Sequence, residues 1–264
     1  MNRNVSCRLE LSLSGPAELV FCVAVAANVP LRSESISIEV NGRPEPPTEL
    51  RDEHGTRLHQ VHADAGTVVL EYAAVTRGQA DPAPVAELDR LHYLRQSRYC
   101  EADSLAPTAA AEFAGLEGPS LLVAVGEWVN QRIAYVSGSS SGTDSALDTL
   151  LARQGVCRDF AHLSIALLRA LGVPARLAAV YAPGLSPMEF HAVCEALVEG
   201  AWWVVDATRH APRQSLLRVA TGRDAADTAF LTSFGASVEL TAIEVSAVAE
   251  DFAVDDQSTL TQLR

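Results

Sequence analysis

The residue of this 264-residue chain that is best placed for chemistry is Cys157, in the segment Gly-Val-Cys-Arg-Asp-Phe-Ala-His-Leu at positions 155–163. Between positions 158 and 171 the apolar residues recur at helical spacing, and Gly172 ends the pattern. Cys157 therefore stands at the first turn of a predicted buried helix, where unpaired N–H groups and the helix dipole stabilise an anion. Because the thiolate is the reactive form of cysteine, this position suits a covalent catalyst.

The residues around Cys157 leave alternatives open. Arg158 could stabilise a thiolate, whereas Asp159 would oppose it if its carboxylate faced the sulfur, and could equally cap the helix. We expect Gly155 to end the preceding helix, since glycine tolerates a left-handed backbone. A buried structural cysteine is the alternative to the catalytic hypothesis.

A catalytic cysteine needs a base, and the base needs a group that orients it. Downstream, His191 lies at the start of a predicted strand over 190–198, and Asp206 lies in a second predicted strand over 202–208. These two residues are the candidates for the base and its partner.

The turn between the two strands decides whether the histidine and the aspartate can meet. If residues 199–200 form a two-residue turn, Val198 pairs with Ala201, and the two side chains become diagonal neighbours on one face, roughly 7–8 Å apart at the backbone. A three-residue turn that pairs Val198 with Trp202 would place Asp206 on the opposite face. The triad hypothesis therefore predicts the two-residue register, or a bulge that restores it.

Other candidate residues favour structural roles. Cys194 lies on the opposite strand face from His191, which argues against Cys194 as the nucleophile. His162, over a helical turn beyond Cys157, is expected to be hydrogen-bonded within the core. We predict no metal site and no cofactor, because no recognised ligand spacing joins Cys157, His162, His191, Asp206 and His210.

The ordered blocks of this half resemble the transglutaminase-like superfamily, in particular its bacterial members. The resemblance covers about 128–230 and rests on Tyr135 before a glycine-rich loop, GVCRDFAHL, LLRALGVPAR, a histidine opening a strand, WWVVDAT and TGRDAADTAF. It implies that Cys157 is the nucleophile, His191 the base and Asp206 its orienting group. It also implies an α+β, papain-like core, with helices packed on an antiparallel sheet.

The chain departs from the family pattern beside the histidine, where Val193 stands in place of a frequent tryptophan. The side-chain donor to an oxyanion also stays open. The backbone N–H of Cys157 is a natural donor, while Trp128 and Gln154 are only speculative partners, and Trp128 is expected in the core.

The first hundred residues favour β structure. Alternating or continuous apolar runs predict strands at 5–13, 19–27, 35–40 and 67–73, and Asn41-Gly42 is a hairpin turn signal. We therefore predict a small β-sandwich-like domain over 1–99, a connecting segment over 100–118 and a transglutaminase-like catalytic core over 119–264. The β-rich N-terminal part of the chain is similar to the domain that precedes the core in many bacterial members of the transglutaminase-like superfamily.

Net charge and cysteine content indicate which classes of partner to exclude and which cellular compartment to expect. The net charge is −13, and all 20 basic residues are arginine, which argues against nucleic acid or an anionic membrane as a partner. The five cysteines have irregular spacing and no CxxC pair, so a reducing cytoplasm is expected. The apolar run over 19–29 follows eighteen residues that include two glutamates, unlike a signal peptide, and is too short to span a bilayer.

The predicted function is cysteine-dependent acyl transfer on peptide or side-chain amides through a thioester. Hydrolysis, as in a protease or amidase, is favoured over amine cross-linking, because many bacterial members resemble cysteine peptidases. The expected partner is a peptide or protein substrate, and the oligomeric state stays open. The alternative is a non-catalytic peptide-binding module on the same fold.

Overall fold

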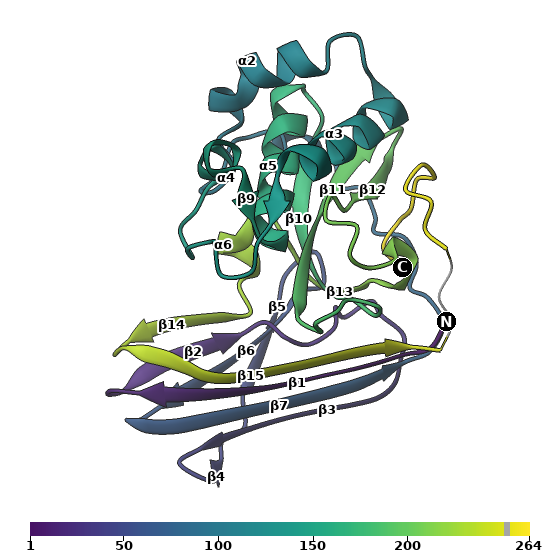
Figure 1. The fold of residues 1–264 in the computed structure, drawn as a ribbon. Helices are drawn as coiled ribbons and strands as arrows, with labels where there is room; N and C mark the ends of the chain where they lie inside the picture. The colour runs from purple at the N-terminus through teal and green to yellow at the C-terminus, as the bar shows by residue number, and fades with distance from the viewer. Residues whose placement is uncertain (251–253) are drawn as a thin grey trace.

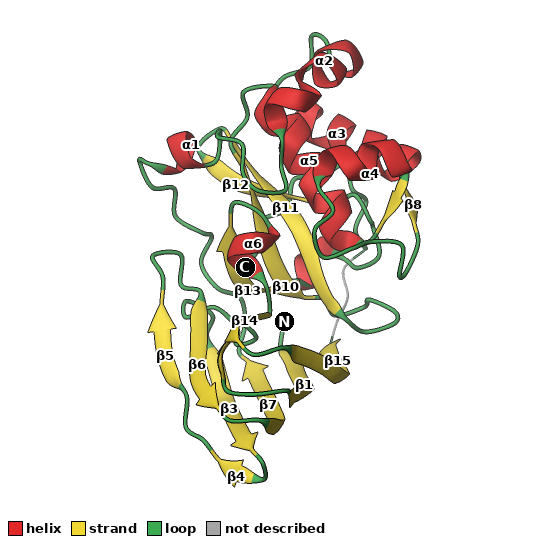
Figure 2. Ribbon diagram, turned by 90° about the vertical axis from the view of Figure 1, so that its left-hand side faces the viewer, coloured by secondary structure: helices red, strands yellow, loops and turns green. Residues whose placement is uncertain are grey.

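The computed structural model describes residues 1–250 and 254–264, which form antiparallel sheets and a layer of helices. Two sheets make a β-sandwich, and a third carries helices on one face (Figures 1 and 2). In Figure 1 the sandwich lies below the helical layer, with the N-terminus at the right-hand end of its strands and the C-terminus above it, beside the third sheet. The predicted α+β fold, with helices packed on an antiparallel sheet and a sandwich-like β region, is confirmed.

The sandwich draws its strands from two separate parts of the chain. Its first sheet has the order β15 (Val238–Ala249), β1 (Arg3–Leu13), β7 (Gly66–Thr76), β3 (Leu31–Val40) and β4 (Arg43–Pro44). Its second sheet has the order β14 (Leu231–Gly235), β2 (Ala17–Phe21), β6 (Arg57–Ala63) and β5 (Thr48–Arg51).

Alternation along β1 shows how the sequence specifies this sandwich. Every second residue of β1 is buried, and inward residues such as Leu9 and Leu11 join a common core. The predicted hairpin turn after β3 is confirmed, with Asn41 at φ 51° and Gly42 at φ 73°. These positive values fit the turn type that Asn-Gly favours between twisted antiparallel strands.

Two predicted boundaries differ from the structure. The predicted strand over 19–27 stops at Phe21, and residues 22–26 are buried without being a strand. A continuous apolar run carries no periodicity that would distinguish a buried strand from other buried chain. The predicted core over 119–264 included residues 231–249, yet β14 pairs with β2 and β15 pairs with β1. The C-terminal strands therefore return to the sandwich.

The third sheet has the order β12 (Ala201–Val205), β11 (Phe190–Val198), β10 (Ala175–Tyr181) and β13 (Leu217–Gly222). The central helix α5 (Cys157–Ala170) packs on β10 and β11, close to the predicted span of 158–171. Helix α2 (Ala102–Glu112) lies in the predicted connecting segment and packs against α5. The remaining elements are α1 (Asp89–His92), α3 (Gly118–Arg132), β8 (Ala134–Tyr135), α4 (Ala146–Ala152), β9 (Gln154–Gly155), the 3₁₀ helix η1 (Arg213–Ser215) and α6 (Ala225–Thr228).

The sandwich and the core share buried contacts. The Tyr181 hydroxyl at the end of β10 donates to the carbonyl of Val23 at 2.9 Å, and its ring stacks on Tyr72 of β7. The Ala26 N–H donates to the carbonyl of Arg218 on β13 at 2.9 Å. The buried segment 22–26 therefore joins the two parts at β10 and β13.

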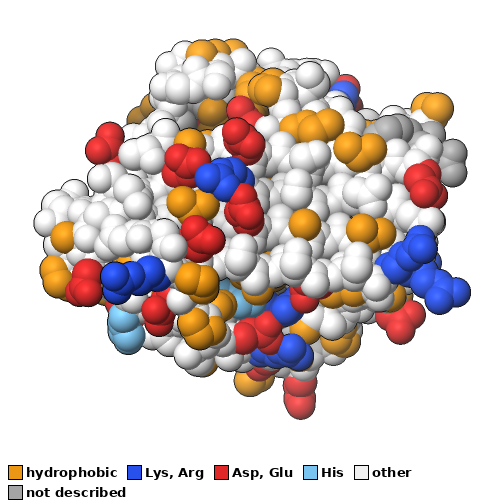
Figure 3. All heavy atoms as spheres, turned by 90° about the horizontal axis from the view of Figure 1, so that it is seen from below, with side chains coloured by type: hydrophobic (Ala, Val, Ile, Leu, Met, Phe, Trp, Pro, Cys, Tyr) orange, Lys and Arg blue, Asp and Glu red, His pale blue; other side chains and the backbone are white. Residues whose placement is uncertain are grey.

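The surface mixes charge types. Seen from below (Figure 3), acidic, arginine and apolar side chains are interspersed. Arg8 on β1, for example, forms ion pairs with Glu10 and Glu71. Within the described ranges, the structure contains no helix long and apolar enough to cross a membrane.

Candidate active site

Cys157 occupies the position that its sequence context predicts. It is the first residue of α5, after Val156 in extended conformation. Its side chain is partly exposed, whereas the chain's other four cysteines are buried. The thiol points toward the carbonyl of Phe190 at 4.0 Å, next to His191 in the chain. The nucleophile candidate is thus reachable from solvent and close to the start of β11.

Asp159 caps the helix. Its Oδ2 accepts the Val156 N–H at 2.8 Å, and its Oδ1 accepts from Arg158 at 3.3 Å. The expected role of Gly155 is wrong, because Arg153, at φ 58°, is the left-handed residue that ends α4. Gly155 is needed for close approach instead, since a Cβ there would lie 2.7 Å from the Asp159 Cβ.

The guanidinium of Arg158 serves the neighbouring loop. It donates to the Ser140 hydroxyl at 2.6 Å and to the Ser141 carbonyl. Together with its contact to Asp159, this ties the glycine-rich loop over 137–142 to the first turn of α5. Arg158 therefore holds the loop beside Cys157.

The turn between β11 and β12 has the two-residue register. Val198 pairs with Ala201, and Cys194 pairs with Val205, so this prediction is confirmed. His191 and Asp206 meet as that register requires, with Nε2 and Oδ2 2.9 Å apart. Both side chains are only 1% exposed, which makes this a buried pair.

The contact between His191 and Asp206 shifts the pKa of each side chain. Burial would lower the pKa of His191, but the Asp206 charge, its hydrogen bond and a hydrogen bond with the Cys157 thiol raise the pKa to about 10. Burial would raise the pKa of Asp206, but the His191 charge and bonds from His191 and Thr208 hold it below its usual value. Because Nε2 is taken by Asp206, Nδ1 is the ring nitrogen left for the sulfur.

Thr208 fixes the aspartate. Its backbone N–H and its hydroxyl donate to the Asp206 Oδ1 at 3.0 and 2.7 Å. Since Oδ1 is held by Thr208, the other oxygen stays directed at His191. This support comes from the last residue of the WWVVDAT segment.

Tyr135 is a site residue to which the sequence pattern assigned no role. Its hydroxyl lies near the backbone N–H of Cys157, and burial raises the pKa of Tyr135 to about 12. The short parallel pair of β8 and β9 places Tyr135 beside Gly155, two residues before the nucleophile. Its conspicuous signal in the sequence is its place just before the glycine-rich loop.

The two oxyanion partners considered from the sequence do not reach the site. The Trp128 indole N–H donates to Glu112 at 2.7 Å, and its ring packs against Phe113. Gln154 is exposed. Neither residue contributes a hydrogen bond to Cys157, His191 or Asp206.

Cys194 and His162 have structural positions. Cys194 is fully buried, and burial raises the pKa of its thiol well above the usual value. His162 accepts the Ala225 N–H at 3.1 Å and stacks on Tyr99, while burial lowers its pKa to about 3. A neutral, hydrogen-bonded His162 matches the role expected for it.

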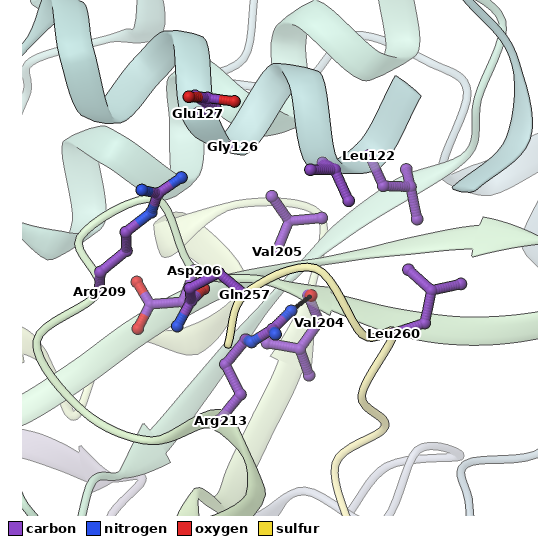
Figure 4. Close-up of a pocket in the computed structure, with 11 residues that line it drawn as sticks. Leu122, Gly126, Glu127, Val204, Val205, Asp206, Arg209, Arg213, Gln257 and Leu260 are labelled. Carbon is purple, nitrogen blue, oxygen red and sulfur yellow. Dashed lines mark hydrogen bonds between the residues drawn. The ribbon is translucent and has the colours of Figure 1, made fainter. Parts of the chain in front are cut away.

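A cavity of about 360 Å³ opens beside Cys157 and His191. A second, smaller cavity behind Asp206 has room for about one water, at about 20 Å³. Figure 4 shows this smaller one, with Asp206, Arg209 and Arg213 on one side and Leu122 of α3 on the other. The larger cavity is therefore the one that can take a substrate.

These groups together can form and resolve a covalent acyl intermediate. A partly exposed thiol lies at a helix N-terminus, a buried imidazole lies near it, and a fixed carboxylate orients the imidazole. A thiol, a base and a group that orients the base are the parts that nucleophilic catalysis by cysteine requires.

Comparisons with known proteins agree with this geometry. A family model described as the transglutaminase-like superfamily matches residues 110–207, which include Cys157, His191 and Asp206. A crystal structure described as a candidate cysteine protease from Cytophaga hutchinsonii is 32% identical, with a TM-score of 0.86. That match covers 100% of this chain and 93% of the other.

Curated relatives match over shorter stretches. An uncharacterised protein of Mycobacterium leprae is 32% identical over 120 residues, which are 41% of this chain and 42% of that protein. One from Mycobacterium tuberculosis is 52% identical over 50 residues, or 19% of this chain and 15% of that protein. The matches thus span less than half the length of these relatives. From the family model and the full-length structural likeness together, this chain belongs to the transglutaminase-like superfamily, with a fold that supports a cysteine-protease-like function.

Proposed function

We propose that this chain hydrolyses peptide or side-chain amides through a thioester on Cys157. The observation that carries the proposal is the junction of three groups. Cys157 begins α5 and lies close enough to His191 to raise the pKa of the imidazole, whose Nε2 is 2.9 Å from the Asp206 carboxylate. A helix, a strand and the residue that follows a second strand thus bring the three side chains together.

The raised pKa of His191 favours a protonated imidazole opposite a thiolate. The Cys157 sulfur attacks the amide carbon, and an S–C bond forms as the carbonyl π electrons move to oxygen. His191 then gives its proton to the amide nitrogen, the C–N bond breaks and an amine or ammonia leaves. Water attacks the thioester, His191 accepts its proton, and the sulfur departs as a thiolate.

Two donors converge on the developing oxyanion. The backbone N–H of Cys157 and the hydroxyl of Tyr135 lie near each other. A substrate oxygen between them would accept from both, and a preorganised donor of this kind contributes about 100-fold or more to kcat. Tyr135 thus supplies the side-chain donor in this proposal.

Water, and not an amine, is the proposed acyl acceptor. Among the described residues that line the cavity at Cys157, none is acidic. A lysine side chain entering as the second substrate would therefore lose its hydration without meeting a carboxylate. This chemistry supports hydrolysis over cross-linking.

Turnover of a peptide panel tests the proposal. The panel is incubated with the full chain, with and without a primary amine, and released amine and incorporated amine are both measured. The chain contains no lysine, so no lysine of its own competes with the added amine. We expect release without incorporation, abolished in Cys157→Ala while the melting temperature is retained.

Two other outcomes overturn the proposal. Incorporation of the amine as the main product would make the chain a transferase. Silence across the panel from a folded protein, together with alkylation of Cys157 at pH 6 no faster than an ordinary thiol, would favour the peptide-binding module.

A further inference from the structure

The cavity beside Cys157 is built jointly by the core and the sandwich. Leu177 and Ala179 of β10 and Ala192 of β11 contribute from the sheet. Cys22 and Phe230 contribute from the chain that leads into and out of the sandwich. Because the Cys22 N–H donates to the Phe230 carbonyl at 2.9 Å, these two walls are fixed to each other.

The walls are largely apolar. Phe230 stacks on Phe190 with ring centroids 5.3 Å apart, and Phe190 in turn packs on Tyr181 at 5.5 Å. Burial raises the pKa of the Cys22 thiol to about 12, so this thiol is neutral. The aromatic stack gives the cavity a rigid side, which suits recognition of shape.

The charged groups at the cavity are already engaged. Arg158 is bound to Asp159 and to the loop at Ser140. His191 is bound to Asp206.

The other polar side chains at the wall are Tyr99 and Thr228, and the Thr228 hydroxyl already donates to the Asp224 carbonyl at 3.4 Å. A charged side chain entering this cavity would lose water without meeting an opposite charge, and an amide would regain little beyond the Tyr99 hydroxyl, whereas an apolar side chain gains from leaving water.

We propose that this cavity is the subsite that selects an apolar side chain, aliphatic or aromatic, from the peptide substrate. The proposal rests on the proposed function, because it concerns the same site. It adds that glutamine, the amide side chain, is a poor occupant. A volume of about 360 Å³ also lies within the range of small-molecule sites, so a large aromatic ring can enter.

The test compares peptides that differ at one residue, placed in turn at each position near the scissile bond. At one of these positions, kcat/KM for leucine or phenylalanine should exceed that for glutamine, glutamate or lysine by about 10-fold or more. Equal or better turnover of the polar peptides at every position would overturn the proposal.

Variants locate the preference in the cavity. Ala179→Leu adds volume to a wall of the cavity and should reduce turnover of the phenylalanine peptide about 10-fold more than turnover of an alanine peptide. Ala242→Leu is the matched control, because Ala242 is exposed on β15 of the sandwich. An equal effect of the two variants would contradict the assignment.

A binding experiment separates this inference from the proposed function. Cys157→Ala is titrated with N-acetyl-leucinamide and N-acetyl-glutamine amide, and perturbations of the Ala179 and Ala192 methyl signals are followed by NMR. Preferential binding of the leucine compound supports the subsite even if the wild-type chain turns over nothing. Turnover without any side-chain preference would leave the proposed function standing and refute the subsite.

Discussion

The buried pair of His191 and Asp206 makes a quantitative prediction for Asp206→Asn. The pair raises the pKa of His191 from an ordinary 6.5 to about 10, a shift that corresponds to about 5 kcal/mol at 1.36 kcal/mol per pKa unit. Asparagine keeps the size of the side chain and removes the charge. Burial then opposes only the smaller contribution of the Cys157 thiol, so the pKa of His191 should fall to about 6.5 or below.

The loss of that charge should disable the nucleophile near neutral pH. In the proposed mechanism a protonated ring activates the Cys157 sulfur. In Asp206→Asn the imidazole should be neutral at pH 7 and lose this effect. NMR titration of the His191 ring should show a midpoint lower by more than about 3 units in Asp206→Asn. Alkylation of Cys157 at pH 6 should be slower in this variant than in the wild-type chain.

Asp255→Asn is the matched control. Asp255 forms a buried ion pair with Arg213 at 2.7 Å, so this variant also removes a paired carboxylate, but one that does not touch the imidazole. Asp255→Asn should leave the titration midpoint of His191 unchanged. A midpoint that stays above about 8 in folded Asp206→Asn would refute the reasoning, because burial would then not govern the ring.

Three further outcomes follow from the same geometry. Tyr135→Phe should lower kcat about 100-fold with little change in KM or melting temperature, and an unchanged kcat would exclude this hydroxyl from the oxyanion site. Gly155→Ala brings a Cβ to 2.7 Å from the Asp159 Cβ and should destabilise the fold by about 1–3 kcal/mol in urea denaturation. Gly142→Ala meets nothing within 4 Å and should be neutral, so equal effects would contradict the packing argument. Because the folded pKa of His191 lies above its unfolded value, its stabilisation is complete below about pH 6.5 and is lost as the pH rises toward 10. The free energy of unfolding of the wild-type chain should therefore exceed that of Asp206→Asn by less and less as the pH rises from about 6.5 to 10. A difference that increases over this pH range would contradict the raised pKa of His191.

Local patterns predicted the nucleophile's setting and the strand register. Helical spacing correctly predicted that Cys157 lies at the start of a helix. A two-residue turn correctly predicted the register in which β11 pairs with β12. Both depend on neighbours within about ten residues, where periodicity and turn chemistry are informative. The catalytic roles of these residues stay predictions until the variants are measured.

Contacts between distant segments were not predictable in the same way. Tyr135 reaches the Cys157 amide through the two-residue parallel pair of β8 and β9, which is too short to leave a pattern. Likewise, position 155 requires glycine because the Asp159 side chain packs against it. The left-handed backbone that the sequence suggested for Gly155 is not the reason. Only the three-dimensional structure shows such approaches.

The return of the C-terminal strands has a consequence for the site. Leu231, the first residue of β14, pairs with Phe21 of β2, and the adjoining residues Phe230 and Cys22 are joined by a backbone hydrogen bond. Both of these adjoining residues line the cavity at Cys157. The sandwich therefore does more than precede the core, since its second sheet fixes the wall against which a substrate side chain would pack. A change that loosens the β2–β14 pairing should alter side-chain preference while leaving the hydrogen bond between His191 and Asp206 intact.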